Sequence, residues 1–404
     1  MLSGAFRRCV TSATARWHVA IVGSGPAGFY AADYLLKGDP NVQVDIYERL
    51  PVPFGLVRYG VAPDHQEVKN VTTRFGQIAA DSRCSLLANV HVGDGAARAA
   101  DDVSAHISLD ALREQYHCVL LAHGADSDRT LGLPGEELQG VHGARQFVEW
   151  YNGHPSAVDR DFGLSSCETA VVIGHGAQAP LFTHTQPPPT RLSSCTAARI
   201  SCCCHHHRAA LAWFPFHAPM TTFDRWCALM RRAGNVALDC ARMLSATPEQ
   251  LVGDTDVAAH AAAILAQSSV RQVVLLGRRG VAHAAFTIKE LRELSKRSGC
   301  TTSVMAPAHA FNAAVLEYAG RDRPRKRITE LLQKMSKTTV ATADPPPPPP
   351  STEDRAIRIQ FQRSPLGFIA ESASPDQLAA VRVVCNKLEG EPPASAHPRP
   401  HSHA

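Results

Sequence analysis

A glycine-rich turn near the start of the chain has the residue types and spacing needed to bind a dinucleotide. Gly23, Gly25 and Gly28 form the pattern G-x-G-x-x-G directly after the apolar run His18–Val22, which predicts a strand. The following residues, FYAADYLLK, carry apolar side chains at helical spacing. In a strand, turn and helix of this kind, the glycines let main-chain N–H groups at the helix N-terminus approach a pyrophosphate.

An acidic residue stands where such a site requires one. A second apolar run, Val42–Tyr47, ends at Glu48, about 20 residues after Gly28, a spacing at which a carboxylate binds the adenosine ribose. A glycine triplet alone could be an incidental turn. Because the strand, helix, second strand and acid follow in register, the sequence favours a dinucleotide-binding domain.

A second glycine turn follows another apolar run, but the chain interrupts it. Thr169–Ile173 predicts a strand and ends in a glycine pair, yet the helical pattern NVALDCARML begins only after residues 177–234. If that stretch is set aside, the joined sequence reads G-x-G-x-x-A and continues into a helix, which predicts a second nucleotide site. The residues that would form it are Gly174, His175, Gly176, Asn235 and Val236.

The interrupting segment, residues 177–234, differs in composition from the rest of the chain. It contains a single acid, a run of three prolines, and the consecutive residues Cys202–Cys204 and His205–His207. These residues suggest a metal site, but zinc ligands are spaced across a turn or hairpin, because adjacent side chains rarely converge on one ion. We therefore predict no metal site. The segment is a retained intron, an error in the gene model, or a real loop.

Two arginines follow the next predicted strand. Val270–Leu276 leads into Gly277, Arg278, Arg279 and Gly280, where NAD-binding folds carry an acid. Guanidinium groups pair with the 2′-phosphate of NADP in a bidentate manner, and the missing acid removes a hydrogen bond that favours NAD. A solvated basic turn is the alternative interpretation.

The most basic stretch of the chain is RDRPRKR, residues 321–327. Charge runs are usually solvated surfaces. A basic patch would also attract and orient an acidic protein partner.

Composition limits the remaining possibilities. Of the 404 residues, 45% are hydrophobic and 19% charged, which is typical of a folded globular protein. The net charge of +4 gives no reason to expect a nucleic-acid partner, and no apolar run approaches the length of a membrane span. The 12 cysteines include no CxxC or CxxxxC pair, which argues against a zinc ribbon and a flavin disulfide reductase.

The first residues have the composition of a targeting signal. Residues 1–16, MLSGAFRRCVTSATAR, are basic, rich in hydroxyl groups and free of acids, which indicates a mitochondrial transit peptide rather than a secretory signal.

Several long stretches resemble one known family. YERLPVPFGLVRYGVAPDH with the following EVKNVTTRF, the first glycine turn, and GRRG with AFTIKELREL are similar to adrenodoxin reductase, the mitochondrial FAD-containing NADPH:ferredoxin oxidoreductase. The resemblance covers most of residues 18–176 and 235–390. It implies an FAD site lined by Ala27, Glu48, Leu56 and Val92. It further implies that Glu290 lies on the nicotinamide side of the NADPH site, and that Arg292, Arg321 and Arg325 dock the ferredoxin.

The family implies a fold and a domain order. We expect an α/β protein with two doubly wound Rossmann-like domains, the NADP domain being inserted into the FAD domain. After the transit peptide, residues 17–165 would form the first part of the FAD domain, and residues 166–340 the NADP domain, interrupted by 177–234. Residues 341–390 would return to an apparently truncated FAD domain, and residues 391–404 would form an unstructured tail.

The activity implied by the resemblance is electron transfer from NADPH through FAD to an acidic, transiently bound [2Fe–2S] ferredoxin in the mitochondrial matrix. It allows a loose association with the inner membrane surface. Because the cofactors carry the chemistry, no side chain is predicted as a catalytic acid or base. The alternative is a non-catalytic or mis-assembled remnant of this family, favoured by the split NADP motif and by the missing C-terminal FAD segment.

Overall fold

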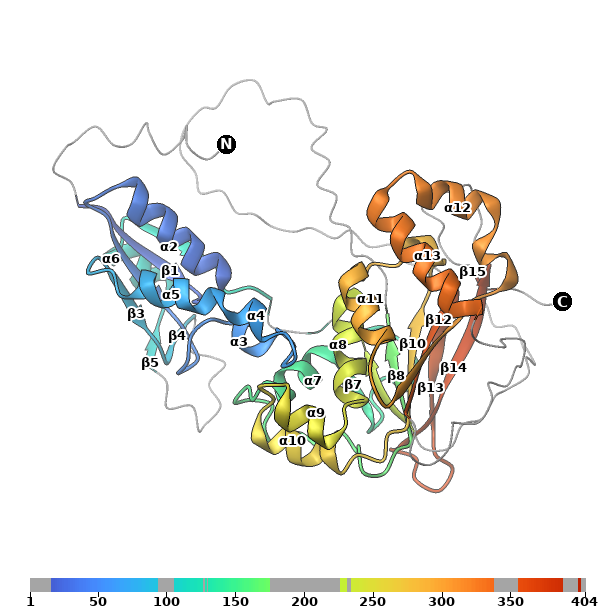
Figure 1. Cartoon of the computed structure of the whole chain (residues 1–404). Helices are drawn as coiled ribbons and strands as arrows, with labels where there is room; N and C mark the ends of the chain where they lie inside the picture. The colour runs from blue at the N-terminus through green and yellow to red at the C-terminus, as the bar shows by residue number, and fades with distance from the viewer. Residues whose placement is uncertain are drawn as a thin grey trace.

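The computed structural model describes residues 16–93, 105–125, 128, 130–174, 226–230, 234–337, 355–387 and 399–400. These residues form two α/β modules that follow one another along the chain (Figure 1). Within this part of the chain, no helix is long and apolar enough to cross a membrane. The expected transit peptide, apart from Arg16, lies outside the described residues.

The first module is built on a parallel sheet of four strands in the order β3-β2-β1-β6. Its strands are β1 (His18–Val22), β2 (Gln43–Tyr47), β3 (Cys84–Leu87) and β6 (Cys118–Leu121), with a small pair, β4 (Val90–Val92) and β5 (Ala105–Ile107). Its helices are α2 (Pro26–Gly38), α3 (Leu56–Tyr59), α4 (Gln66–Lys69), α5 (Val71–Ala79) and α6 (Leu109–Gln115). One core joins the sheet to α2 and α5, and a smaller one lies beneath α6.

The second module is built on a parallel sheet of six strands in the order β11-β12-β10-β8-β9-β7. These strands are β7 (Val141–Gly143), β8 (Thr169–Ile173), β9 (Trp226–Met230), β10 (Gln272–Gly277), β11 (Cys300–Met305) and β12 (Arg355–Phe361). Every residue of β8 and of β10 is buried, as continuous apolar strands covered on both faces require.

Helices cover one face of this sheet and antiparallel strands the other. The elements on the helical side are α7 (Ala144–Tyr151), α8 (Gly234–Leu244), α9 (Pro248–Gly253), α10 (Ala259–Ala266), α11 (Ile288–Ser295), α12 (Ala313–Gly320), α13 (Arg323–Lys337), and the 3₁₀ turns η2 (Val281–His283) and η3 (Ala308–Phe311). On the other face, β13 (Arg363–Ala370) and β14 (Leu378–Lys387) pack Phe368, Leu378 and Val381 against β8 and β10.

The structure confirms two parallel, Rossmann-like α/β modules, and it corrects the domain assignment of residues 355–387, the described part of the range 341–390. We expected these residues to return to the first module, but β12 pairs with β10 and β11 in the second sheet, and β13–β14 cover that sheet. The burial of β12 explains the difference, because five of its seven residues are buried, as an internal strand requires. Two residues of the expected unstructured tail also pair with β14, as strand β15 (Arg399–Pro400).

Part of the segment that the sequence marked as foreign is integrated in the sheet. β9 lies between β8 and β7 and is parallel to both. Helix α8 begins at Gly234, the last residue of that segment. The rest of the segment, with His175 and Gly176, lies outside the described residues.

Candidate functional site

The first glycine turn has the geometry that the motif predicts. Gly23 has a φ of +110°, and its N–H group donates a 2.8 Å hydrogen bond to the Tyr47 carbonyl at the end of β2. A Cβ atom on Gly23 would lie 2.6 Å from the Ala122 carbonyl oxygen, and one on Gly28 would collide with the Gly23 carbonyl oxygen. Gly25, at the start of α2, has nothing within 4 Å of an added Cβ. The fold therefore requires two of these glycines, and the third leaves open space.

Glu48 lies beside this turn, held by main-chain and side-chain donors. Its carboxylate is buried, and one oxygen accepts hydrogen bonds from the Ser24 main-chain N–H (3.1 Å) and hydroxyl (2.6 Å). The other oxygen accepts the Leu50 N–H group at 3.0 Å. The carboxylate is thus fixed next to the glycine turn, where a ribose would bind. Ser24 was not predicted as a site residue, although the sequence shows a hydroxyl residue between the first two glycines.

Apolar residues lie on the elements that follow the turn and β2 in the first module. Leu56 is 60% exposed at the start of α3, and Ala27 is exposed in the first turn of α2. The loop before α3 approaches the turn closely, since a Cβ on Gly55 would lie 3.1 Å from the Gly25 Cα. Val92 is half-buried at the end of β4, which begins with a hydrogen bond from Val90 to the Glu48 carbonyl. Such a rim suits a flat, partly apolar cofactor.

The second glycine turn repeats the geometry of the first. Gly174 has a φ of +108°, and its N–H group donates to the Leu276 carbonyl at 2.7 Å. At the start of α8, a Cβ on Gly234 would lie 2.5 Å from the Ala285 carbonyl, so this position admits only glycine without movement of the main chain. Gly234 was placed in the foreign segment, and its tight packing corrects that boundary. The next two residues, Asn235 and Val236, contact the Thr287 N–H group and the module core, respectively.

Arg278 and Arg279 lie beside this second turn. They follow β10, which pairs with β8 so that Leu276 stands opposite Ile173, the residue before Gly174. Both arginines are exposed, and neither makes an ion pair with another described residue. Two guanidinium groups are therefore available to an anion at the edge of the sheet where the turn lies.

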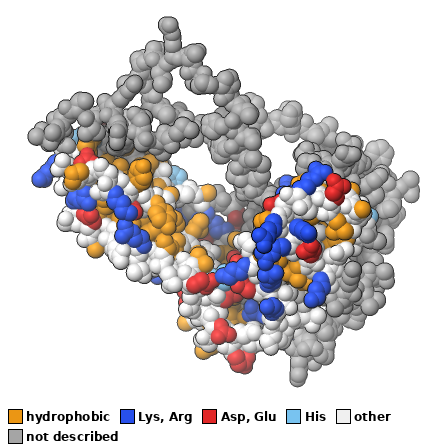
Figure 2. All heavy atoms as spheres, turned by 45° about the horizontal axis from the view of Figure 1, so that its top comes forward, with side chains coloured by type: hydrophobic (Ala, Val, Ile, Leu, Met, Phe, Trp, Pro, Cys, Tyr) orange, Lys and Arg blue, Asp and Glu red, His pale blue; other side chains and the backbone are white. Residues whose placement is uncertain are grey.

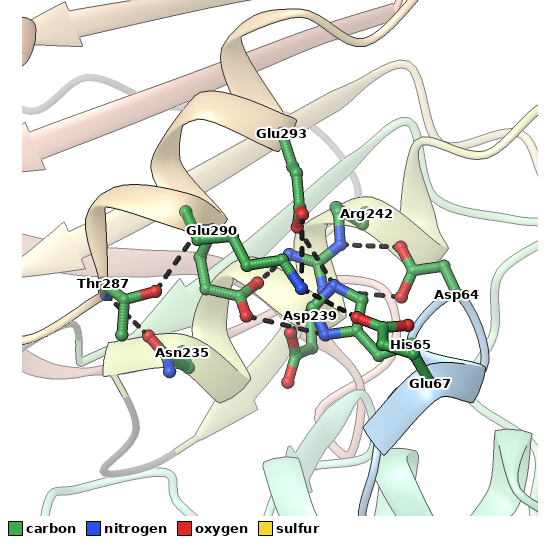
Figure 3. A network of polar contacts seen from close by, with 10 residues as sticks. Asp64, His65, Glu67, Asn235, Asp239, Arg242, Thr287, Glu290 and Glu293 are labelled. Carbon is green, nitrogen blue, oxygen red and sulfur yellow. Dashed lines mark hydrogen bonds and ion pairs between the residues drawn. The ribbon is translucent and has the colours of Figure 1, made fainter. Parts of the chain in front are cut away.

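A buried charge network connects the two modules (Figure 3). Arg242 on α8 is 2% exposed and contacts three carboxylates, Asp64 at 2.7 Å, Asp239 at 2.6 Å and Glu290 at 2.5 Å. His65 lies 3.5 Å from Glu290. Asp64 and His65 belong to the first module, whereas the other three residues belong to α8 and α11 of the second.

The surroundings of the network shift two of its pKa values. Burial raises the pKa of Asp239 to about 6, although the Arg242 guanidinium acts in the opposite direction. Burial disfavours the charged form of Arg242, but Asp64 and Asp239 outweigh it and raise the pKa of Arg242 above its usual range. The network therefore keeps a permanent positive charge among several carboxylates.

Of the residues in this network, only Glu290 was predicted from the sequence, and four others were not. Asp64 and His65 stand in the quoted family stretch, and Asp239 and Arg242 face the same side of α8 at a spacing of three. The atoms of His65, Glu290 and Glu293 also lie within 4.8 Å of one another, as metal ligands would. Because Arg242 already neutralises Glu290, this group offers a cation less negative charge than its composition indicates.

The expected partner residues lie on helices of the second module. Arg292 is exposed on α11, and Arg321, between α12 and α13, is paired with Glu317 at 3.0 Å. Arg325 is only half-exposed, because its guanidinium lies 4.6 Å from the centre of the Tyr318 ring.

Comparisons with known proteins agree with this geometry. Residues 21–76 match the model of an NAD(P)-binding Rossmann-like domain. The chain is 39% identical over 373 residues to the mitochondrial NADPH:adrenodoxin oxidoreductase of Salvelinus fontinalis, covering 92% of this chain and 60% of the relative. The corresponding Arabidopsis thaliana protein is 36% identical over 384 residues, with 95% and 64% coverage. FprA of Mycobacterium tuberculosis in complex with NADPH superposes with a TM-score of 0.70 at 29% identity, covering 96% of this chain and 68% of that one.

By these comparisons the chain is similar to Rossmann-like oxidoreductases. More narrowly, the chain is homologous over nine-tenths of its length to proteins named mitochondrial NADPH:adrenodoxin oxidoreductase. It spans about three fifths of the length of the curated relatives that it matches. Because the homology extends over nine-tenths of the chain, the alternative of a non-catalytic remnant has no support in these comparisons.

Proposed function

We propose that this protein transfers electrons from NADPH through FAD to an acidic [2Fe–2S] ferredoxin in the mitochondrial matrix. One observation carries the proposal: two glycine turns of matching geometry, with Gly23 and Gly174 at φ values of +110° and +108°, stand in two modules that a buried charge network joins. The names of the homologous proteins support the mitochondrial location and the adrenodoxin-type partner.

The first module has the residues to hold FAD. Gly23, Gly25 and Gly28 would receive the pyrophosphate at the N-terminus of α2, and Glu48 would bind the ribose. Leu56, Ala27 and Val92 supply an apolar rim for the ring system. When bound, the flavin accepts a hydride from NADPH and passes on single electrons, which the protein's side chains cannot do.

The second module has the residues to hold NADPH. Gly174, with His175, Gly176, Asn235 and Val236, would receive the pyrophosphate, and Arg278 and Arg279 would bind the 2′-phosphate. Glu290, buried between the modules and fixed by Arg242, would face the nicotinamide. The protein's contribution is to bring the two rings together and exclude water.

The partner surface would be the basic face of α11, α12 and α13. Lys and Arg side chains gather on the second module where α12 and α13 come forward (Figure 2). Arg292 and Arg321 project from this face, and an acidic ferredoxin would bind it transiently by charge complementarity. The proposal includes at most a loose association with the inner mitochondrial membrane.

Binding of adenosine phosphates to the full chain tests the NADP site. The double variant Arg278→Ala/Arg279→Ala should bind 2′,5′-ADP at least about tenfold more weakly, because each charge-assisted contact contributes about 1.5–3 kcal/mol. Its affinity for 5′-AMP, which lacks the 2′-phosphate, should be unchanged in the same calorimetric titration. Arg113→Ala, an exposed arginine on α6, is the control. If the double variant and the wild type prefer 2′,5′-ADP over 5′-AMP by the same factor, these arginines do not belong to the site.

A further inference from the structure

A histidine lies at the edge of the proposed 2′-phosphate site, and the proposed function does not assign it a role. His283 ends the short turn η2, which is separated from Arg278 and Arg279 only by Gly280. It is half-buried, and its imidazole stacks on the Tyr318 ring of α12 with centroids 5.7 Å apart and an interplanar angle of 27°. The guanidinium of Arg325, from α13, lies 4.6 Å from the centre of the same Tyr318 ring.

The charged groups around His283 have one sign. Burial lowers the pKa of His283, and the positive charges of Arg279 and Arg325 lower it further. The groups that face it are thus Arg279 beside η2, Arg325 on α13 and the uncharged Tyr318 on α12. In the described part of the chain, neither guanidinium makes an ion pair with an acid, and Asp322 accepts only the main-chain N–H group of Arg325.

Such a cluster costs stability unless an anion neutralises it. Like charges held close together repel one another, and each is more stable when a negative group lies between them. A phosphate monoester carries nearly two negative charges at neutral pH and three acceptor oxygens. Its binding would favour the protonated imidazole, so that binding would take up a proton.

We propose that His283 is a protonatable ligand of the 2′-phosphate, completing with Arg279 and Arg325 a site whose affinity for NADP rises as the pH falls. This inference rests on the proposed function, because it assigns a further residue to the same nucleotide site. Arg325, expected on the partner surface, then also serves nucleotide binding. A change in mitochondrial pH would alter the NADP affinity of this protein through one side chain.

The test measures the affinities of the full chain for 2′,5′-ADP and for 5′-AMP by calorimetric titration at about pH 6 and about pH 8. Wild-type protein should bind 2′,5′-ADP about tenfold more weakly at the higher pH, relative to 5′-AMP. The ligand cannot cause this trend, because its own phosphate, with a second pKa of about 6, gains charge as the pH rises. Because both ligands carry the 5′-phosphate, the ratio of their affinities excludes the effects of other titrating groups near the pyrophosphate.

His283→Gln keeps a polar side chain of similar reach but cannot be protonated. It should bind about tenfold more weakly than wild type at the lower pH, and within about twofold of wild type at the higher pH. His283→Lys, which carries a permanent charge, should bind at the higher pH as tightly as wild type does at the lower, and it keeps the test decisive if the glutamine variant does not fold.

The outcomes separate this inference from the proposed function. If wild type prefers 2′,5′-ADP over 5′-AMP but His283→Gln retains the wild-type pH dependence, the role of His283 is overturned and the NADP site stands. If wild type shows no preference for 2′,5′-ADP at either pH, both are overturned.

Discussion

A glycine in these turns can be required by the main-chain conformation or by the space that a ligand would need. The φ angle of each glycine and the space around its Cα distinguish the two cases. Gly23 and Gly174 both have φ values in the left-handed region, and a Cβ at Gly23 would lie against the Ala122 carbonyl. Gly25 has a φ of −75° and open space at its Cα, so nothing in the fold requires glycine there. The close approach of a nucleotide, as proposed above, would account for its lack of a side chain.

Substitution of these glycines should separate binding from stability. Gly25→Ala should leave the urea midpoint of unfolding unchanged or slightly higher, because alanine restricts the unfolded chain, while FAD affinity falls at least about tenfold. Gly23→Ala should lower stability by about 1–3 kcal/mol, because its φ and the Ala122 contact are both unfavourable to a side chain. Unfolding curves and FAD fluorescence titrations measure the two effects.

Gly38→Ala is the matched control for this series. Gly38 ends the same helix, and an added Cβ meets nothing within 4 Å. It should keep both stability and FAD binding. A Gly25→Ala protein that binds FAD as wild type does would show that the pyrophosphate does not lie at this turn.

At the level of elements, one short segment of the first module determines how the modules meet. The stretch that ends with α4 supplies Asp64 and His65 to the network around Arg242, and Lys69 to an ion pair with Asp256 at 2.7 Å. Glu67 is paired with Lys289 at 2.7 Å. Charged contacts between the modules therefore concentrate on the segment from Asp64 to Lys69.

Local patterns predicted β1, β2, β8 and β10. They predicted the first turn because its strand, glycines and helix are contiguous in sequence, whereas the second turn was predicted only after residues 177–234 had been set aside. The contact between Asp64 and Arg242 was not predictable in this way, since the two residues are 178 positions apart and come together only when the modules pack. The apolar pattern of β12 likewise predicted a strand but not its neighbours, and the assignment to the first module was wrong. Periodicity defines the exposed and buried faces of a strand, whereas its place in a sheet depends on non-local packing.

The buried arginine should contribute far more to stability than the exposed ion pair beside it. Arg242→Met should lower the free energy of unfolding by about 3–5 kcal/mol at neutral pH, because it leaves three carboxylates buried without a counter-charge. Lys289→Ala removes an ion pair whose side chains are 57% and 56% exposed, and it should change stability little. Urea unfolding of both variants measures the contrast, and equal effects would contradict it.

The pH dependence of the same variant gives a second test. The raised pKa of Asp239, about 6, means that the folded state favours its protonated form, so this carboxyl group stabilises the fold less as the pH rises through that value. Without the Arg242 charge, which lowers the pKa of Asp239, this carboxyl group should be protonated more readily still. The stability deficit of Arg242→Met should therefore shrink as the pH is lowered from about 7 to about 5.

At the scale of the whole molecule, the distribution of charged residues over the surface affects partner binding more than the net charge does. The net charge of +4 arises from 41 basic and 37 acidic residues, a nearly balanced surface. On this background, the segment from α11 to α13 carries Arg292, Arg321 and a run of basic residues at the start of α13. A local excess of one sign accelerates the encounter with a partner of the opposite sign, and salt screens the effect.

Charge reversal on this face should therefore slow electron transfer to a ferredoxin without impairing the flavin. Arg292→Glu combined with Arg321→Glu should reduce NADPH-dependent reduction of an acidic [2Fe–2S] ferredoxin by about tenfold at low salt, and it should flatten the salt dependence of the rate. Reduction of a small dye, which needs no docking surface, should stay near the wild-type rate. Arg113→Glu makes the same kind of charge change on α6, in the other module, and should slow neither reaction. If the rates of ferredoxin and dye reduction fall together, the basic residues of this face stabilise the structure rather than bind the partner. If Arg113→Glu lowers the rate of ferredoxin reduction as much per changed charge as the double variant does, the net charge of the protein governs the encounter, and this face does not.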